Sequence, residues 1–231
     1  IARAAVISLY IFTTPNITVV IPKMNGKESL QMGMMPCIKY FKMLEKTQFS
    51  SPMSKYTYTK NYIKEYKNFV PQELAKEIIH QQDLSFYPAT TGGGKLNTHR
   101  NCLIKTLDPK FNKEIGDVFR SAFKSYIQEF HFFDYIKGDT TGWDHVLYIG
   151  ERAQEYKEHV DFSSNQGPRI LTCSLILNDD YDGGDFTFFE GEYTIPKKSC
   201  SAIVFPSNFC FPHAVTPVSN GDRHVVITWV R

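Results

Sequence analysis

The sequence lacks the features that would assign it to several common protein classes. Its five cysteines are dispersed over 231 residues without a C-x-x-C pair, so it predicts neither a zinc ribbon nor a disulfide framework. Lysine and arginine (26) nearly balance aspartate and glutamate (24), and no basic run of the nucleic-acid-binding type occurs. We therefore expect no nucleic-acid partner, and cysteine usage leaves the compartment open.

Long hydrophobic runs are also missing. The stretch AAVISLYIF, residues 4–12, is followed at once by TTPN, so it falls short of the roughly 20 apolar residues of a membrane-spanning helix. We expect no membrane segment there. The composition is nevertheless 42% hydrophobic and 14% aromatic, which is enough to build a sizeable core.

The chain divides into two parts by pattern. Residues 1–55 carry no sustained periodicity, and we interpret them as an N-terminal extension of uncertain structure. Residues 56–231 are predicted to form one domain that begins with helices. Pro71 followed by Glu73 indicates a helix start, and residues 108–131 place aromatic and aliphatic side chains at steps of three and four, the pattern of a helix packed on a sheet.

From about residue 143 the pattern becomes strand-like and remains so to residue 231. Helices followed by many short strands predict an α+β domain whose β part, about residues 143–231, is a sandwich or barrel. RILTCSLIL is apolar almost throughout, as expected of a central strand covered on both faces. The predicted strands are WDHVLYI, EYKEHVD, RILTCSLIL, DFTFFE, EYTI, SAIVFP and HVVITWV, after an earlier candidate, RNCLIKTL.

His159 and Asp161 stand two residues apart where the second of these late strands ends. In an extended backbone, side chains two apart point to the same side, so an imidazole and a carboxylate would converge and could hold a cation. A lone H-x-D is more often a pair of solvated loop residues. A metal site therefore needs a third ligand elsewhere in the chain.

Two later histidines could supply that ligand. His213 follows the strand SAIVFP, and His224 lies on the final strand beside Arg223. Successive strand residues point to opposite faces, so His224 and Arg223 cannot both face a pocket. If Arg223 faces inward, two histidines, one carboxylate and a guanidinium can share one site. Two histidines and a carboxylate form the ligand set of non-haem Fe(II) oxygenases, and a guanidinium suits the distal carboxylate of a bound 2-oxo acid.

These residues resemble a known family. Residues from about 58 to 231 are similar to the prolyl 4-hydroxylase branch of the Fe(II)/2-oxoglutarate-dependent dioxygenases. That branch is marked by Y-x-x-H-x-D, a G-G turn, and a distal histidine followed about ten residues later by a basic residue. The resemblance implies a double-stranded β-helix (jelly roll) flanked by helices. The matching residues are Tyr156, His159, Asp161, Gly183, Gly184, His213 and Arg223.

The resemblance also implies roles for individual residues. Iron would be held by His159, Asp161 and His213, and Arg223 would pair with the C5 carboxylate of 2-oxoglutarate. Tyr148 matches a tyrosine that hydrogen-bonds 2-oxoglutarate in several relatives, and the alternative is an aromatic core residue on a half-buried strand. No catalytic residue beyond the metal centre is implied.

Other positions favour structural roles or depart from the pattern. Ile176 stands where some relatives have a second tyrosine, and arginine at position 223 replaces the lysine usual in collagen-type enzymes. Tyr156 is expected to pack beside the metal, and Trp229 to line the pocket or the core. The acidic turn DDYDGGD is interpreted as solvated rather than calcium-binding, since it lacks the terminal glutamate of an EF-hand loop. Support for the ligands is expected around Cys173, Leu175 and Phe205.

The resemblance predicts a dioxygenase that uses Fe(II), 2-oxoglutarate and O2, with ascorbate as a candidate reductant. It would hydroxylate an unactivated C–H bond, with a peptidyl proline as the first expectation, and release succinate and CO2. A protein or peptide substrate is expected ahead of a small molecule. A cupin-like zinc hydrolase or lyase could use the same His/Asp/His set. Arg223 favours the oxygenase, and Glu158, the neighbouring candidate for a general base, should point away from the site.

Overall fold

The computed structural model describes residues 57–81, 85–91, 98–136, 139–162 and 168–231. All of them lie within one unit, Met53–Arg231. The predicted extension over residues 1–55 lies outside the described residues. Within the described ranges, no helix has both the length and the apolar character needed to cross a membrane.

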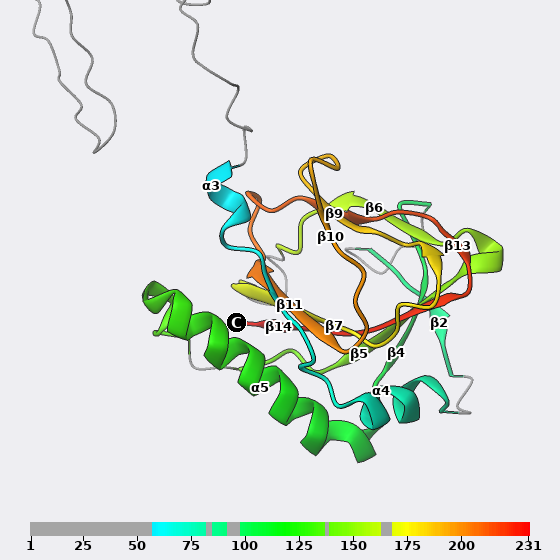
Figure 1. Cartoon of the computed structure of the whole chain (residues 1–231), viewed down its shortest axis with the longest axis horizontal. Helices are drawn as coiled ribbons and strands as arrows, with labels where there is room; N and C mark the ends of the chain where they lie inside the picture. The colour runs from blue at the N-terminus through cyan, green and yellow to red at the C-terminus, as the bar shows by residue number, and fades with distance from the viewer. Residues whose placement is uncertain (1–56, 82–84, 92–97, 137–138, 163–167) are drawn as a thin grey trace, which may run out of the picture. The chain divides into compact units, whose positions relative to one another are not determined.

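Two antiparallel sheets face each other in the cartoon of the chain (Figure 1). The larger has seven strands and the smaller has five. In spatial order, the larger sheet contains β1 (Lys64–Tyr66), β11 (Ser201–Pro206), β7 (Leu171–Ile176), β14 (Asp222–Val230), β5 (Asp144–Ile149), β4 (Leu103–Thr106) and β2 (Tyr87–Pro88). The smaller contains β10 (Tyr193–Ile195), β9 (Phe186–Phe188), β12 (His213–Val215), β6 (Glu155–His159) and β3 (Arg100–Asn101).

A two-stranded ribbon of β8 (Asp182–Gly183) and β13 (Val218–Asn220) accompanies the two sheets. The arrangement is a double-stranded β-helix, and the predicted α+β jelly-roll class is confirmed. As predicted, β7 is a central strand: it pairs with β11 on one side and β14 on the other, and all six of its residues are buried.

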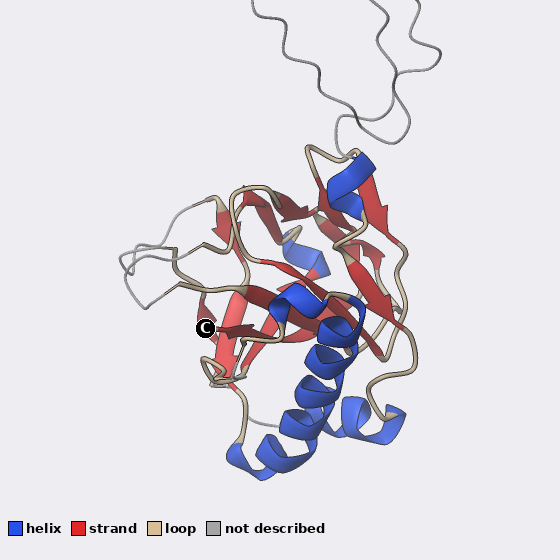
Figure 2. Ribbon diagram, turned by 90° about the vertical axis from the view of Figure 1, so that its left-hand side faces the viewer, coloured by secondary structure: helices blue, strands red, loops and turns tan. Residues whose placement is uncertain are grey.

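Two helices cover the outer face of the larger sheet, and Figure 2 shows them on one side of the strands. They are α4 (Gln72–Ile79) and α5 (Asn112–Glu129), preceded in the chain by the short α3 (Thr57–Lys60). The Asp108 side chain accepts a hydrogen bond from the backbone N–H of Lys110, which caps the turn that leads into α5. The predicted helix over residues 108–131 is thus divided, with 3₁₀ turns at Pro109–Phe111 and His131–Phe133 flanking α5.

The core consists of two apolar layers separated by the larger sheet. One layer joins the helices to the sheet and includes Ile78, Phe119, Cys173 and Leu175. The other fills the space between the two sheets, where Val146, Phe188, Phe205 and Val225 meet. Burial of apolar surface in both layers holds the sheets at a fixed separation, and polar residues between the sheets therefore face an enclosed space.

Candidate metal centre

Two facing strands of the smaller sheet bring the predicted histidines together. β6 and β12 are antiparallel neighbours, and His159 lies directly opposite His213 in their register. The two imidazole centroids are 4.3 Å apart. Cross-strand partners point to the same face, so both rings face the interior although 53 residues (160–212) separate them in the chain.

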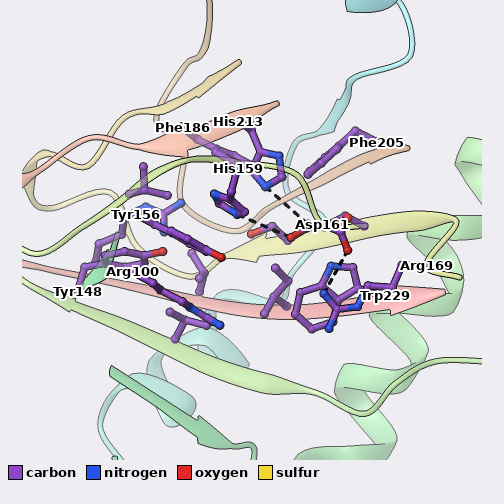
Figure 3. Close-up of a pocket in the computed structure, with 17 residues that line it drawn as sticks. Arg100, Tyr148, Tyr156, His159, Asp161, Arg169, Phe186, Phe205, His213 and Trp229 are labelled. Atoms are coloured by element: carbon purple, nitrogen blue, oxygen red, sulfur yellow. Dashed lines mark hydrogen bonds and ion pairs between the residues drawn. The ribbon is translucent and has the colours of Figure 1, made fainter. Parts of the chain in front are cut away.

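Asp161 completes a cluster two residues beyond His159 (Figure 3). Its Oδ1 lies 3.7 Å from His159 Nε2, and its Oδ2 lies 3.6 Å from His213 Nε2. All three ligand atoms lie within 4.8 Å of one another. Two ring nitrogens and a carboxylate gathered on one side of a common point can bind a divalent cation and leave its other positions open.

Backbone carbonyls orient both imidazoles. His159 Nδ1 lies 2.8 Å from the carbonyl oxygen of Lys157, and His213 Nδ1 lies 3.0 Å from that of Phe211. A carbonyl only accepts, so each Nδ1 carries the proton and donates it. Each Nε2 then presents a lone pair towards Asp161. This tautomer is the one that a metal ligand requires, and the donor set therefore fits Fe(II).

A hydroxyl pair fixes the carboxylate. Thr172 on β7 donates a 2.8 Å hydrogen bond to Asp161 Oδ2, and its oxygen lies 2.8 Å from that of Ser207. Because the Thr172 proton goes to the carboxylate, Ser207 donates to Thr172. Asp161 is thus held in place before any ion is present.

The charge states of His159 and Asp161 also suit metal binding. Burial, reinforced by the neighbouring His213, lowers the pKa of His159 to about 3, although Asp161 acts in the opposite direction. Burial disfavours the charged carboxylate of Asp161, but the two imidazoles and the Thr172 hydroxyl outweigh it and lower the pKa of this group. Near neutral pH the His159 ring is neutral and Asp161 is ionised, which are the forms that bind a cation.

The triad opens into a cavity of about 90 Å³ between the sheets. Alternate residues of β14 line it, namely Arg223, Val225, Ile227 and Trp229, whereas His224 faces the other side of the sheet and lies 3.0 Å from His145. The prediction that Arg223 shares its face with Trp229 and not with His224 is therefore met by the strand geometry.

Arg223 and Tyr148 lie side by side in the same cavity. They are directly opposite in the register of β14 and β5, and the guanidinium carbon lies 5.2 Å from the centroid of the tyrosine ring. Arg223 is only 2% exposed, and its Nε–H has no hydrogen-bond partner. Among the described residues no carboxylate forms a salt bridge with it, so the cavity contains a buried cation that can accept an anionic ligand.

Asp179, Asp180 and Asp182 of the turn DDYDGGD are exposed, in keeping with a solvated turn, whereas two other residues of this turn are buried. Tyr181 is buried; burial raises the pKa of its phenol, and the nearby guanidinium of Arg223 acts in the opposite direction. Gly184 has φ +62°, and a Cβ there would lie 2.9 Å from the Tyr181 ring and 3.2 Å from Arg223 Cδ. The turn therefore packs closely against the side chain of Arg223.

Support for the ligands also differs from the expected set. Cys173 and Leu175 point towards the helices, whereas Thr172 and Ser174, which alternate with them, face the cavity. Phe205 does line the cavity, as expected. The ring of Tyr156 stacks on that of His159, with centroids 3.4 Å apart and planes 13° apart, which agrees with a packing role. Glu158 accepts a hydrogen bond from the backbone of Glu190 and is not in the lining.

Two further arginines in the lining were not anticipated. Arg169 lies over the ring of Trp229 at 3.7 Å, and Arg100 lies over that of Tyr156 at 5.1 Å. Figure 3 places them on opposite sides of the triad. Neither stands at a diagnostic spacing from the H-x-D pair, and no signal in the sequence would have selected them from the other basic residues.

Comparison with known proteins agrees with this geometry. Residues 145–231 match the family model of the 2OG-Fe(II) oxygenase superfamily. A PKHD-type hydroxylase of Alteromonas mediterranea is 32% identical over 90 residues, which are 34% of this chain and 39% of the relative. A PKHD-type hydroxylase of Synechococcus is 37% identical over 86 residues, covering 33% and 36% of the two chains. The matched segment thus spans about two fifths of these relatives.

Solved structures share the fold. A Pseudomonas putida prolyl-4-hydroxylase superposes with a TM-score of 0.56 at 20% identity, covering 74% of this chain and 92% of that one. A Trichoplax adhaerens prolyl hydroxylase, solved with a peptide fragment of the hypoxia inducible factor oxygen degradation domain, gives 0.61 at 20% identity, with 76% and 85% covered.

Proposed function

We propose that this protein is a prolyl 4-hydroxylase-like dioxygenase that hydroxylates a peptidyl proline, because residues 145–231 match the family model of the 2OG-Fe(II) oxygenase superfamily. The observation that carries the proposal is the convergence of two imidazole Nε2 atoms and one carboxylate beside a buried guanidinium. Bound iron and 2-oxoglutarate would supply the oxidising chemistry, in which one atom of O2 would enter the substrate and the other would enter succinate as CO2 is released.

The residues of the chain bind and orient the reactants. His159, Asp161 and His213 would hold Fe(II). Backbone carbonyls fix the tautomer of the two imidazoles, and the Thr172 hydroxyl holds the carboxylate. Arg223 would pair with the distal carboxylate of 2-oxoglutarate. Tyr148 has its ring against that guanidinium, and its hydroxyl would donate a hydrogen bond to the co-substrate. The apolar walls from β14 and β9 would exclude water from the reaction.

A peptidyl proline is supported by the fold neighbours, which are prolyl hydroxylases, one of them solved with a peptide. The zinc hydrolase alternative has less support, since Glu158, its expected general base, does not line the cavity. Ascorbate as a reductant remains a prediction.

Succinate release tests the proposal. The protein is loaded anaerobically with Fe(II) and 2-oxoglutarate, exposed to O2, and assayed with and without proline-containing peptides. We expect succinate formation that proline peptides stimulate, that His159→Ala abolishes and that Arg223→Ala reduces by raising the 2-oxoglutarate concentration required. Arg152→Ala, at an exposed arginine outside the cavity, serves as the control. Inactivity with iron combined with hydrolysis after zinc loading would refute the proposal.

A further inference from the structure

Arg223 borders a second, much smaller pocket besides the main cavity. The lining of this pocket, which has a volume of about 10 Å³, also includes Ile176, Tyr181, Gly184 and Lys197. A space of this size holds at most about one water molecule, so it is too small for a carboxylate or a peptide group. The residues on this side of Arg223 can therefore affect a bound ligand only through the position of the arginine.

Lys197 binds the turn that lines this pocket. Its ammonium donates a 2.9 Å hydrogen bond to the backbone carbonyl of Tyr181 and another of 2.9 Å to that of Gly183. It also lies 4.7 Å from the centroid of the Tyr181 ring. The two acceptors stand on either side of Asp182 in the chain, so one side chain holds the turn at two points. Hydrogen bonds from a charged donor are about twice as strong as those between neutral groups.

The backbone of this turn is costly to fix in place. Gly183 and Gly184 both have φ +62°, in the left-handed region, and glycine loses more conformational entropy on ordering than any other residue. Gly184 packs so closely that a Cβ there would lie 3.2 Å from Arg223 Cδ. Its N–H donates a 3.0 Å hydrogen bond to the carbonyl of Pro217, just before β13, whereas Lys197 holds two carbonyls of the turn. The ammonium thus complements the backbone contacts that keep the turn against the arginine.

We propose that Lys197 is a positioning residue for the co-substrate anchor. Its ammonium fixes the turn at residues 181–184, and the turn fixes the Arg223 side chain where it meets the distal carboxylate of 2-oxoglutarate. This rests on the proposed function and adds a residue to it. Ile176 offers no hydrogen-bond donor beside the arginine. Affinity therefore depends on where the guanidinium lies, because its paired hydrogen bonds to a carboxylate require a fixed orientation.

Calorimetric titration of the anaerobic Mn(II)-loaded protein with 2-oxoglutarate tests the inference without turnover. Lys197→Met keeps an aliphatic side chain and removes the ammonium. We expect the Kd for 2-oxoglutarate to rise about tenfold in this variant, while the Kd for Mn(II) stays unchanged. Lys197→Arg keeps the charge and the donors and should recover most of the affinity. Lys124→Met, at an exposed lysine of α5, is the control and should bind 2-oxoglutarate as the wild type does.

Oxalate separates positioning of the anchor from general damage to the cavity. It chelates a metal as a 2-oxo acid does but has no distal carboxylate to meet Arg223, so its Kd should be the same in Lys197→Met and the wild type.

Three results for Lys197→Met would overturn the inference: unchanged affinity for 2-oxoglutarate, an equal loss of affinity for oxalate, or loss of Mn(II) binding, which would indicate a general structural role. The wild type distinguishes the two proposals. If it fails to bind 2-oxoglutarate in a metal-dependent manner, the proposed function fails and this inference fails with it. If it binds 2-oxoglutarate and Lys197→Met binds equally well, this inference alone is wrong.

Discussion

At the scale of single residues, the buried guanidinium of Arg223 depends on the side chains around it. Tyr148 presents its ring to one side, and Tyr181, in the turn before β9, is buried close to Arg223. A long side chain in a mostly apolar cavity has several rotamers available, and such contacts select one of them. Tyr181 thus places a phenol near Arg223. Ile176, which stands where some relatives have a tyrosine, lies near the same arginine and provides no phenol.

Removing that phenol should weaken 2-oxoglutarate binding. Tyr181→Phe keeps the buried ring but removes the phenol hydroxyl beside Arg223; a polar contact of this kind is worth about 0.5–1.5 kcal/mol, or roughly a two- to twelvefold increase in Kd. Calorimetric titration of the anaerobic Mn(II)-loaded protein measures the change. Tyr193→Phe, at a half-buried tyrosine outside the cavity, should leave the Kd unchanged. Equal Kd values for wild type and Tyr181→Phe would contradict a positioning role.

The sequence predicts some of these residues and misses others for a physical reason. His159 and Asp161 could be paired because strand geometry relates residues two apart, and Arg223 could be separated from His224 by the same rule. Arg169 and Thr172 follow Asp161 by 8 and 11 residues, and Tyr181 comes later in the chain, so none of them stands at the two-residue spacing that relates side chains on one strand face. Their proximity arises from tertiary packing, which no local spacing encodes.

At the scale of elements, the packing of α5 on the larger sheet supports β7, a strand that forms part of the cavity wall. Phe119 is 1% exposed in the layer that joins this helix to β7 and β11. Tyr126 of the same helix donates a 2.9 Å hydrogen bond to the Tyr62 carbonyl. The opposite face of β7 carries Thr172, which holds Asp161, so the packing of α5 supports the metal centre through one strand.

Truncation of the Phe119 side chain should be costly. Phe119→Ala would leave a cavity between helix and sheet and lower the free energy of unfolding by about 3–5 kcal/mol, as measured by urea denaturation. Phe132→Ala provides the matched control, because Phe132 is 57% exposed and should change stability by less than about 0.5 kcal/mol. Similar losses for the two variants would show that α5 does not anchor the sheet as described.

The sequence predicted strands correctly where a long run of residues shows the same pattern of apolar side chains. The apolar run RILTCSLIL and the final strand were recognisable because many consecutive side chains are buried, and they correspond to β7 and β14. β12 has three residues and β8 has two, too few for a period to emerge. β12 nevertheless carries His213, so the strand that completes the triad is among the least visible in the sequence.

At the scale of the whole molecule, buried histidines make stability depend on pH. His145 Nε2 lies 3.0 Å from His224 Nδ1 on the helix-facing side of the larger sheet. Burial lowers the pKa of His145 to about 3, with His224 adding to the effect, and burial lowers that of His224 to about 4. Between pH 6.5 and 4 the unfolded chain binds protons at these positions and the native chain does not. Stability is therefore complete above pH 6.5 and falls as the pH drops.

Replacing one member of the pair should reduce this pH dependence. Each excluded proton contributes up to about 1.4 kcal/mol per pH unit to the slope of the unfolding free energy. His224→Asn should therefore give a shallower fall between pH 6.5 and 4.5 than the wild type in urea denaturation. His131→Asn, at an exposed histidine, should retain the full slope. Identical slopes for wild type and His224→Asn would contradict the assignment.

Equilibrium dialysis of the whole protein against Fe(II) under anaerobic conditions tests the central claim most directly. The wild type should bind one ion per chain. His213→Ala and Asp161→Ala should lose that ion while keeping native circular dichroism, and His131→Ala should bind iron as the wild type does. Undiminished iron binding by the His213→Ala and Asp161→Ala proteins would contradict a metal centre built from His159, Asp161 and His213.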